Sequence, residues 1–387
     1  MPLNYASVEN IANNYIQKSL EWQAETLEIA KQLRDLFDQA ADNSQLLCQA
    51  IEQAELTQST LYTAKPTHEP PLATYPLPVL PSHFTLLAAD GSQIAPSRHR
   101  ALQFGLINIC LFKVRFGSAQ APAIDLITEL LDFDQLFVDG MLIGEDEVGL
   151  QRDLRERVLI RENLTSEDTK PILTLTDGPL DLFYRSNIKG DAAQDAQRTV
   201  WELDQHLMQE GILSAGYIDK PGSSMLGNML DIYQNSIKKL PLQREKKQRS
   251  ISDRALLKSR LLPGHRSALY EIVSKRTPPN PHRLHCAFFF LNVAHQTGKE
   301  WLVRVEIPHW LAQKPELVDF VHSALYHDAQ VLDSHPYPYS LHRAHELALV
   351  RLVESEEIES LLLNKLPPEA LDVIMPHSNK DYWKGKK

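Results

Sequence analysis

The sequence lacks the features of a disulfide-bonded, secreted or membrane-spanning protein. Its 387 residues include only three cysteines, Cys48, Cys110 and Cys286, and no CxxC pair. This spacing excludes a disulfide scaffold and a cysteine-based zinc site, and it suits a reducing compartment. No segment approaches the roughly 18 apolar residues that a membrane span needs, and the N-terminus has no signal-peptide pattern. We therefore expect a cytoplasmic protein.

Several familiar catalytic motifs are also absent. The sequence contains no P-loop of the GxxxxGK[ST] form and no GxSxG nucleophile elbow. The segment His342–Glu346 reads HRAHE, which is not the HExxH of zinc proteases. Ala88 stands two residues before Asp90, where a phosphatase of the haloacid dehalogenase type needs its nucleophilic aspartate. These absences argue against P-loop ATP hydrolysis and against three classes of hydrolase.

Charge is distributed unevenly along the chain. The net charge is −10, from 40 basic and 50 acidic residues. Between Lys238 and Arg260 there are nine basic and two acidic residues, so nine minus two leaves +7 in this segment and about −17 elsewhere. Nucleic-acid phosphates respond to local positive charge rather than to the total. The segment is either a DNA-contacting insertion or a solvated one, and its candidate DNA-binding residues are Lys238, Lys239, Arg244, Lys246, Lys247 and Arg249.

Composition divides the chain into three predicted parts. Residues 1–63 have few glycines and prolines and apolar residues at helical spacing, which predicts a helical N-terminal extension. Residues 64–82 carry six prolines, which predicts an extended linker rather than an element. Residues 83–375 alternate strand-like and helical runs, with the basic insertion at about 238–262. This alternation predicts an α/β domain, a mixed sheet flanked by helices.

Short apolar runs rich in β-branched residues give the positions of the predicted strands. The expected strands cover 84–89, 106–114, 172–176, 213–218, 287–293 and 301–307. Helical spacing predicts one helix over 151–163 and a long one over 341–363.

Two predicted strands end in an acid followed by a glycine, Asp90-Gly91 and Asp177-Gly178. An acid at the end of a buried strand has rigid support, and the glycine lets a ligand approach the backbone. Two such acids on neighbouring strands repel each other unless a divalent cation lies between them, and oxygen ligands favour Mg²⁺ or Mn²⁺ over zinc. The alternative is that each Asp-Gly starts an ordinary turn.

The helical stretch over 151–163 offers a third acid. Glu156 shares a face with two apolar residues in the following turn, so it is predicted to point inward, with Arg152 one turn earlier. Glu162 is the alternative third acid. The stretch is also consistent with an exposed helix laced with ion pairs.

Near the C-terminus, Pro336 and Pro338 predict an extended approach to a helix. His345 falls on the apolar stripe that includes Leu341 and Ala348, so it is predicted to face the interior. A core histidine without a catalytic role is the alternative interpretation.

Five ordered motifs together resemble the NurA family of DNA-repair nucleases. They are AADGSQI, RDLRE, LTDGPL, GYIDKPGSS and YPYSLHRAHELA, within roughly Phe84 to Val350, and the last is the most specific. The resemblance implies an RNase H-like core and a homodimer. It implies Mn²⁺- or Mg²⁺-dependent cleavage of single- and double-stranded DNA, of the 5′–3′ exonuclease and single-strand endonuclease type. It also implies a HerA-like hexameric ATPase as partner in resecting double-strand breaks.

The resemblance further implies roles for individual residues. Asp90, Glu156 and Asp177 resemble the family's three catalytic acids, which would hold two cations for phosphodiester hydrolysis. Tyr337 and His345 resemble the tyrosine and histidine near the active site. His345 would orient or protonate a group near the scissile phosphate, and Tyr337 would hydrogen-bond a phosphate oxygen.

Lys220 resembles a lysine that follows another core strand of the family, where it could neutralise a phosphate. Two other functions stay open on the sequence. The chain could be a weakly active or inactive nuclease-like adaptor that docks a DNA translocase, or an unrelated α/β hydrolase of small phosphate esters.

Overall fold

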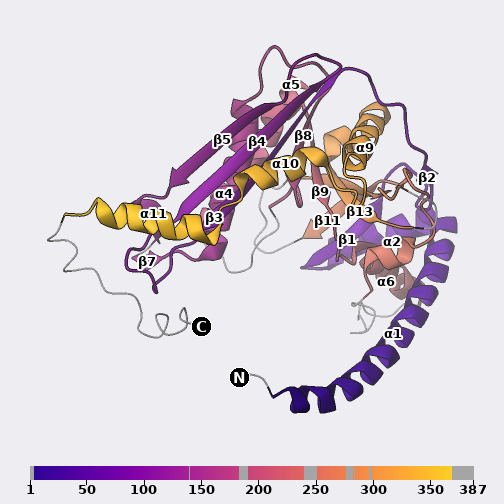
Figure 1. Ribbon diagram of the computed structural model, residues 1–387. Coiled ribbons are helices and arrows are strands. Elements are labelled where there is room, and N and C mark those ends of the chain that lie inside the picture. The colour runs from indigo at the N-terminus through magenta and orange to yellow at the C-terminus, as the bar shows by residue number, and fades with distance from the viewer. Residues whose placement is uncertain are drawn as a thin grey trace. The chain divides into compact units, whose positions relative to one another are not determined.

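The chain forms two compact units in the computed structural model, which describes residues 4–138, 140–182, 191–238, 251–275, 282, 284–295 and 299–367 (Figure 1). Unit 1 combines Met1–Leu77, Ile218–Pro279 and His285–Ala312. Unit 2 combines Pro78–Tyr217, Asn280–Leu284 and Gln313–Lys387. The units therefore differ from the predicted three-part division, because the N-terminal helices share a unit with central segments of the chain. No helix among the described residues is long and apolar enough to cross a membrane.

Unit 1 packs helices against an antiparallel sheet whose strand order is β1-β11-β12-β13. Its strands are β1 (Leu61–Pro66), β2 (Thr74–Tyr75), β10 (Arg266–Ser267), β11 (Tyr270–Lys275), β12 (Cys286–Asn292) and β13 (Leu302–Pro308). Its helices are α1 (Tyr5–Asp42), α2 (Ser44–Thr57), α6 (Met225–Lys238), α7 (Asp253–Leu257) and α8 (His309–Ala312). Phe37, Ile51, Leu230 and Phe288 are fully or nearly fully buried in its core.

The proline-rich stretch is not the featureless linker that its composition predicts. It contributes the end of β1, which pairs with β11, and the short strand β2, which pairs with β10. Within it, Glu69 accepts two hydrogen bonds of 2.9 Å from the buried guanidinium of Arg266, and the ring of Tyr75 lies 3.9 Å from that guanidinium. A bidentate buried ion pair fixes this segment, whose prolines remove several of the backbone amides that could form local hydrogen bonds. Proline content could not reveal a partner almost 200 residues away.

The two halves of α1 differ in burial. The second half buries Leu33 and Phe37 in the core of unit 1. The first half exposes large apolar side chains, among them Tyr15 at 72% and Ile11 at 62%. Propensity rather than packing therefore supports the first half, as far as the described residues go.

Unit 2 is built on a mixed sheet whose strand order is β9-β8-β3-β4-β5. The strands are β3 (Phe84–Ile94), β4 (Leu106–Phe116), β5 (Ala123–Leu130), β8 (Ile172–Asp177) and β9 (Leu213–Ile218), with a hairpin of β6 (Phe137–Val138) and β7 (Met141–Leu142) outside it. β3, β4 and β5 form an antiparallel meander, and β8 and β9 add in parallel on the other side of β3. The prediction of a mixed α/β sheet flanked by helices is confirmed.

Helices cover both faces of this sheet (Figure 1). They are α3 (Phe133–Leu136), α4 (Glu145–Glu162), α5 (Asp191–Glu210), α9 (Pro315–Gln330), α10 (Tyr339–Ala348) and α11 (Leu352–Asn364). Leu87 and Ala89 of β3 share a buried cluster with Leu159 of α4. On the opposite face Tyr339, the first residue of α10, packs edge-on against Phe112 of β4 at 5.9 Å. Because side chains alternate along a strand, consecutive residues of β3 face α4 and α10 in turn.

The single helix predicted over 341–363 is two helices, α10 and α11, which makes that prediction wrong. The chain leaves the helical path at Leu349, and the backbone groups there bind side chains of the sheet. Ser92 donates a hydrogen bond to the carbonyl of Ala348 and accepts one of 2.9 Å from the amide of Val350. Asn108 donates to the same carbonyl at 2.8 Å. These bonds satisfy the broken helix end, which helical periodicity alone could not indicate.

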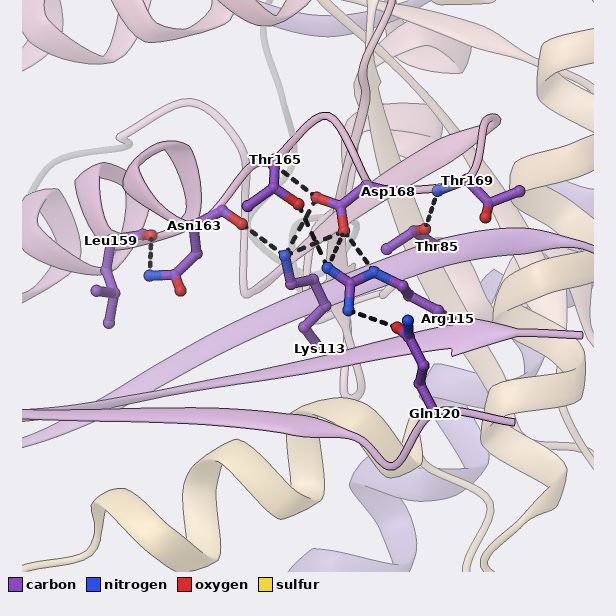
Figure 2. Close-up of polar contacts among 9 residues, drawn as sticks. All are labelled: Thr85, Lys113, Arg115, Gln120, Leu159, Asn163, Thr165, Asp168 and Thr169. Atoms are coloured by element: carbon purple, nitrogen blue, oxygen red, sulfur yellow. Dashed lines mark hydrogen bonds and ion pairs between the residues drawn. The ribbon is translucent and has the colours of Figure 1, made fainter. Parts of the chain in front are cut away.

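A buried ionic network holds the connection between α4 and β8 to the sheet (Figure 2). The carboxylate of Asp168 accepts hydrogen bonds from Lys113 Nζ at 3.1 Å, Arg115 Nε at 2.9 Å and the amide of Thr165 at 2.8 Å. Lys113 also donates to the carbonyl of Asn163, the residue that follows α4. Burial by itself would raise the pKa of Asp168, but the Thr165 amide and the two cations outweigh it and lower this pKa.

We predict that Asp168→Ala destabilises the protein by roughly 3–5 kcal/mol, because it leaves the buried ammonium of Lys113 without its carboxylate. The folded-state pKa of Asp168 lies below its unfolded value. Its stabilisation is therefore present above about pH 4 and is lost as the pH falls through the folded pKa. Urea denaturation of the wild type and the variant, at neutral and acidic pH, measures both effects.

Asp195→Ala is the matched control for this prediction, because Asp195 pairs with Arg198 on the exposed surface of α5. Such pairs contribute roughly 0.2–1 kcal/mol. Equal losses of stability in the two variants would show that the Asp168 network does not stabilise the sheet.

Candidate functional site

Asp90 and Asp177 lie next to each other where the pairing between the parallel strands β3 and β8 ends. The parallel pairing of β3 with β8 ends at the pair Ala89–Thr176, and the two aspartates are the next residues on their strands. Neighbouring strands are about 4.8 Å apart, and register partners project from the same face. Asp177 ends β8 as predicted, whereas β3 continues to Ile94 along β4. At Asp90, β3 is therefore still paired with β4 but is no longer paired with β8.

Both carboxylate oxygens of Asp90 are occupied. Oδ1 accepts a hydrogen bond of 2.8 Å from the amide of Gly91, and Oδ2 lies 2.7 Å from Nδ1 of His345 on α10. Asp90 is 8% exposed. The His345 side chain is 57% exposed, so the prediction that it faces the interior is wrong. The other residues of its stripe on α10, such as Leu341 and Ala348, are buried, whereas His345 meets the carboxylate of Asp90 on the central strand β3.

A buried aspartate anchors the start of α10. Asp328 of α9 accepts hydrogen bonds from the amide of Ser340 at 3.1 Å and from its hydroxyl at 3.2 Å. Burial raises the pKa of Asp328 to about 7, and the two hydrogen bonds offset part of that rise. Ser340 belongs to the C-terminal motif, so one residue of the motif positions the helix that carries another, His345.

Tyr337 lies beside Asp177, and the charge of Asp90 also acts on its phenol. Its hydroxyl hydrogen-bonds Asp177, and its ring packs perpendicular to that of Tyr217 on β9 at 5.5 Å. Burial, together with the negative charges of Asp177 and Asp90, raises the pKa of the Tyr337 phenol far above its ordinary value. The phenol therefore keeps its proton and acts as a donor. Tyr217 was not predicted to be a site residue from the sequence. It lies in the predicted strand over 213–218 and is the second residue of the GYIDKPGSS motif.

Glu156 of α4 approaches β3 at Gly91, the residue that follows Asp90, from the face that α4 covers. It is 4% exposed, so its predicted inward orientation is confirmed. A Cβ added at Gly91 would lie 2.9 Å from Glu156 Oε1 and 2.9 Å from Cγ of Arg152, so the missing side chain at this position admits both. Burial raises the pKa of Glu156 well above its ordinary value; Arg152 opposes this, while Asp153 and Asp90 add to it. Glu162, the alternative acid, is exposed and paired with Arg155 at 2.8 Å.

The loop after Asp177 is tied to both of its neighbours. Gly178 has a positive φ of 96°, which favours glycine, and its amide donates to the carbonyl of Tyr217 at 2.8 Å. Arg157, which follows Glu156 on α4, donates to the carbonyl of Pro179 at 3.1 Å. The helix that carries Glu156 and the loop that follows Asp177 are therefore held together by a direct hydrogen bond.

Each of the three acids has a different partner: His345 for Asp90, Arg152 for Glu156 and Tyr337 for Asp177. Consistent with this, no three acid, histidine or cysteine side chains of the described segments form a ready-made metal-binding group. The donor chemistry nevertheless fits a hard divalent cation, because all three acids offer oxygen and one of them is buried with insufficient compensation of its charge. A cation would exchange with the partners that the acids now hold.

The predicted DNA-binding residues lie apart from these acids in the chain. Lys220 and Lys238 are exposed residues of unit 1, while Lys239, Arg244, Lys246, Lys247 and Arg249 lie outside the described residues. Two charges of the +7 segment have structural partners. Arg260 pairs with Asp38 of α1 at 2.8 Å, and the carboxylate of Asp253 accepts the amides of Met225 and Leu226 at the start of α6. The segment is thus only partly available to a ligand.

Comparisons with known proteins point to one family. A family model described as NurA domain matches residues 84–350, which is more than half of the chain. The NurA nuclease from Sulfolobus solfataricus is similar in structure, with 15% identity, a TM-score of 0.46, and coverage of 88% of this chain and 97% of that one. An endonuclease V from Ciona intestinalis in complex with DNA shows 11% identity, a TM-score of 0.30, and coverage of 72% and 87%.

No curated protein matches the chain. Structural similarities with TM-scores below 0.5 do not by themselves establish a relationship, so the assignment depends on the family model. That model spans the motifs that carry Asp90, Glu156, Asp177, Tyr337 and His345. The chain belongs to the NurA family, a family of nucleases.

Proposed function

We propose that this protein is a divalent-metal-dependent deoxyribonuclease that acts in the cytoplasm on DNA ends, with Mn²⁺ or Mg²⁺ as cofactor. The observation that carries the proposal is that three carboxylates lie around Asp90 and Gly91 of β3, where the pairing of β3 with β8 ends. Asp90 and Asp177 are adjacent on parallel strands, and Glu156 Oε1 reaches the backbone at Gly91. Negative charge of this density at a partly buried site favours a divalent counterion.

We also propose that the sheet of unit 2 is an RNase H-like core. Its support is the topology, an antiparallel meander β3-β4-β5 whose first strand lies centrally, with β8 and β9 added in parallel beside it. In this arrangement the first strand and the first parallel strand meet at the carboxyl end of the sheet. That is where Asp90 and Asp177 lie.

In the proposed reaction Asp90, Glu156 and Asp177 hold the cations, which when bound supply a nucleophilic water and stabilise the leaving oxygen. The chain's own groups orient the phosphate. Tyr337, kept protonated by its surroundings, donates a hydrogen bond to a phosphate oxygen. His345 exposes more than half of its imidazole while Asp90 holds Nδ1, so its free edge can exchange a proton near the scissile bond.

Asp90→Ala should abolish Mn²⁺-dependent cleavage of end-labelled DNA, because it removes the carboxylate shared by β3 and the imidazole of His345. DNA binding, measured by fluorescence anisotropy without metal, should stay within about twofold of wild type, since backbone contacts depend on basic residues. Asp195→Ala on the exposed face of α5 is the control. Normal cleavage by the Asp90 variant would remove Asp90 from the site and leave the adaptor function as the better explanation.

Glu156→Gln and Glu162→Gln distinguish the two candidate third acids on α4. We expect the first to slow cleavage at least about a hundredfold, the order of loss when one electrostatic contact to a reacting phosphate is removed. The second should leave the rate within about twofold, because Glu162 only pairs with Arg155 at the surface. Single-turnover rates with saturating Mn²⁺ measure this, and a reversed order of the two variants would contradict the assignment of Glu156.

Family membership also supports the proposal of a homodimer that works beside a HerA-like hexameric ATPase in end resection. Lys220 and the basic segment from Lys238 to Arg249 are proposed to hold the DNA backbone without reading its sequence.

Light scattering of the purified chain tests the dimer. Digestion of DNA labelled separately at each end, with and without the ATPase, tests the partnership and the proposed 5′–3′ polarity; unchanged rate and end preference would argue against the partner.

A further inference from the structure

The environment of Arg152 on α4 is not explained by the proposed roles of the three acids. Its Nε lies 3.1 Å from Glu156 Oε1, and its Nη2 lies 2.7 Å from Asp153 Oδ1. Its stem passes over Gly91, where an added Cβ would lie 2.9 Å from Arg152 Cγ. The guanidinium therefore reaches the acid site across the backbone position that follows Asp90.

The neighbouring arginines of α4 have other partners. Arg155 binds Glu129 and Glu162 at 2.7 and 2.8 Å, and Arg157 donates to the carbonyl of Pro179. Of these three, Arg152 is the one that pairs with Glu156. Burial would lower the pKa of Arg152, but the charges of Glu156, Asp153 and Asp90 outweigh this and raise it. The guanidinium thus compensates negative charge from both α4 and β3.

The contact between Arg152 and Glu156 depends on charge more than on direction. Arg152 Nε and Glu156 Oε1 are both buried and 3.1 Å apart, yet neither makes a hydrogen bond of good geometry. A directional, fully satisfied hydrogen bond would resist the replacement of Arg152. A contact that depends mainly on charge allows another cation to take the place of Arg152 beside Glu156. Burial also destabilises the charged form of Glu156 and raises its pKa.

We infer that Arg152 is the resident counter-cation of the acid site: it compensates Glu156 and Asp90 until a divalent cation binds, and it competes with that cation. This inference rests on the proposed function, because it assumes that the acids bind metal. Arg152 is a positioning residue, since it acts through Glu156. Its role is to keep the carboxylates together in the metal-free protein at the expense of metal affinity.

The test compares Arg152→Gln with Arg155→Gln, the same substitution about one turn later on the same helix. Without metal, Arg152→Gln should lower the melting temperature by several degrees, because it leaves Glu156 buried without a cation. It should also bind Mn²⁺ about tenfold more tightly in calorimetry, which corresponds to about 1.4 kcal/mol, because one competing positive charge is gone. Saturating Mn²⁺ should therefore restore most of the lost melting temperature.

Arg155→Gln should leave the Mn²⁺ affinity at the wild-type value, and Arg152→Lys, which retains the charge, should stay within about threefold of it. A loss of stability in Arg152→Gln that Mn²⁺ does not reverse, with unchanged or weaker Mn²⁺ binding, would mean that Arg152 is merely structural and would overturn the inference alone. Absence of any Mn²⁺ response in the wild type would overturn the proposed function as well.

The double variant Arg152→Gln/Glu156→Gln keeps the inference testable if the single variant does not fold. A neutral amide in place of the Glu156 carboxylate would need no counter-cation, so the double variant should regain a melting temperature above that of Arg152→Gln. If the double variant is no more stable than the single one, Arg152 does not act by compensating Glu156.

Discussion

Negative charge gathered at one end of a buried sheet is the constraint on which the organisation of unit 2 depends. Carboxylates brought together in a medium of low polarity repel each other and lose solvation, so each needs compensation. The chain supplies three kinds of it: an imidazole for Asp90, a guanidinium for Glu156 and a phenol for Asp177. These partners approach β3 from both of its faces, which explains why a helix must cover each face.

The supports of these partners extend well beyond the acids. Both ends of α10 are fixed by polar side chains, with Asp328 at its start and Ser92 and Asn108 at its end. Ser92 lies two residues after Asp90 on the same face of β3. The strand that carries one acid therefore also anchors the helix that brings His345 to it. This coupling fixes the position of the His345 side chain, which is exposed and which packing alone would allow to adopt several rotamers.

The sequence predicted what depends on local pattern. Apolar runs located β8 and β9 nearly to the residue, and the Asp-Gly pairs identified two acids that turned out to be adjacent. Helical periodicity also predicted the inward orientation of Glu156, although it left Glu162 as the alternative third acid. In each of these cases the feature is encoded within one element, so residues a few positions apart suffice to reveal it.

The sequence did not predict what depends on pairing between distant segments. The order of the proline-rich stretch comes from Arg266, and the break after α10 comes from Ser92 and Asn108. His345 was placed in the interior because periodicity describes the face of a helix without describing what that face meets. The strand β5 was not predicted because its residues alternate between exposed and half-buried, so it lacks the apolar run that marks a buried strand.

Separate compensation of each acid has a consequence for folding. In small zinc domains the cation itself assembles the core, so the metal-free chain is unfolded. Here the cores of unit 2 consist of residues such as Leu87, Ala89, Leu159 and Ile160, and the acids lie at their margin, where protein groups already pair with Asp90 and Glu156. The proposed cation would then be needed for chemistry and not for structure. If the proposed cation binds here, it must displace these internal partners, which would lower the metal affinity of the site and leave the fold independent of the metal supply.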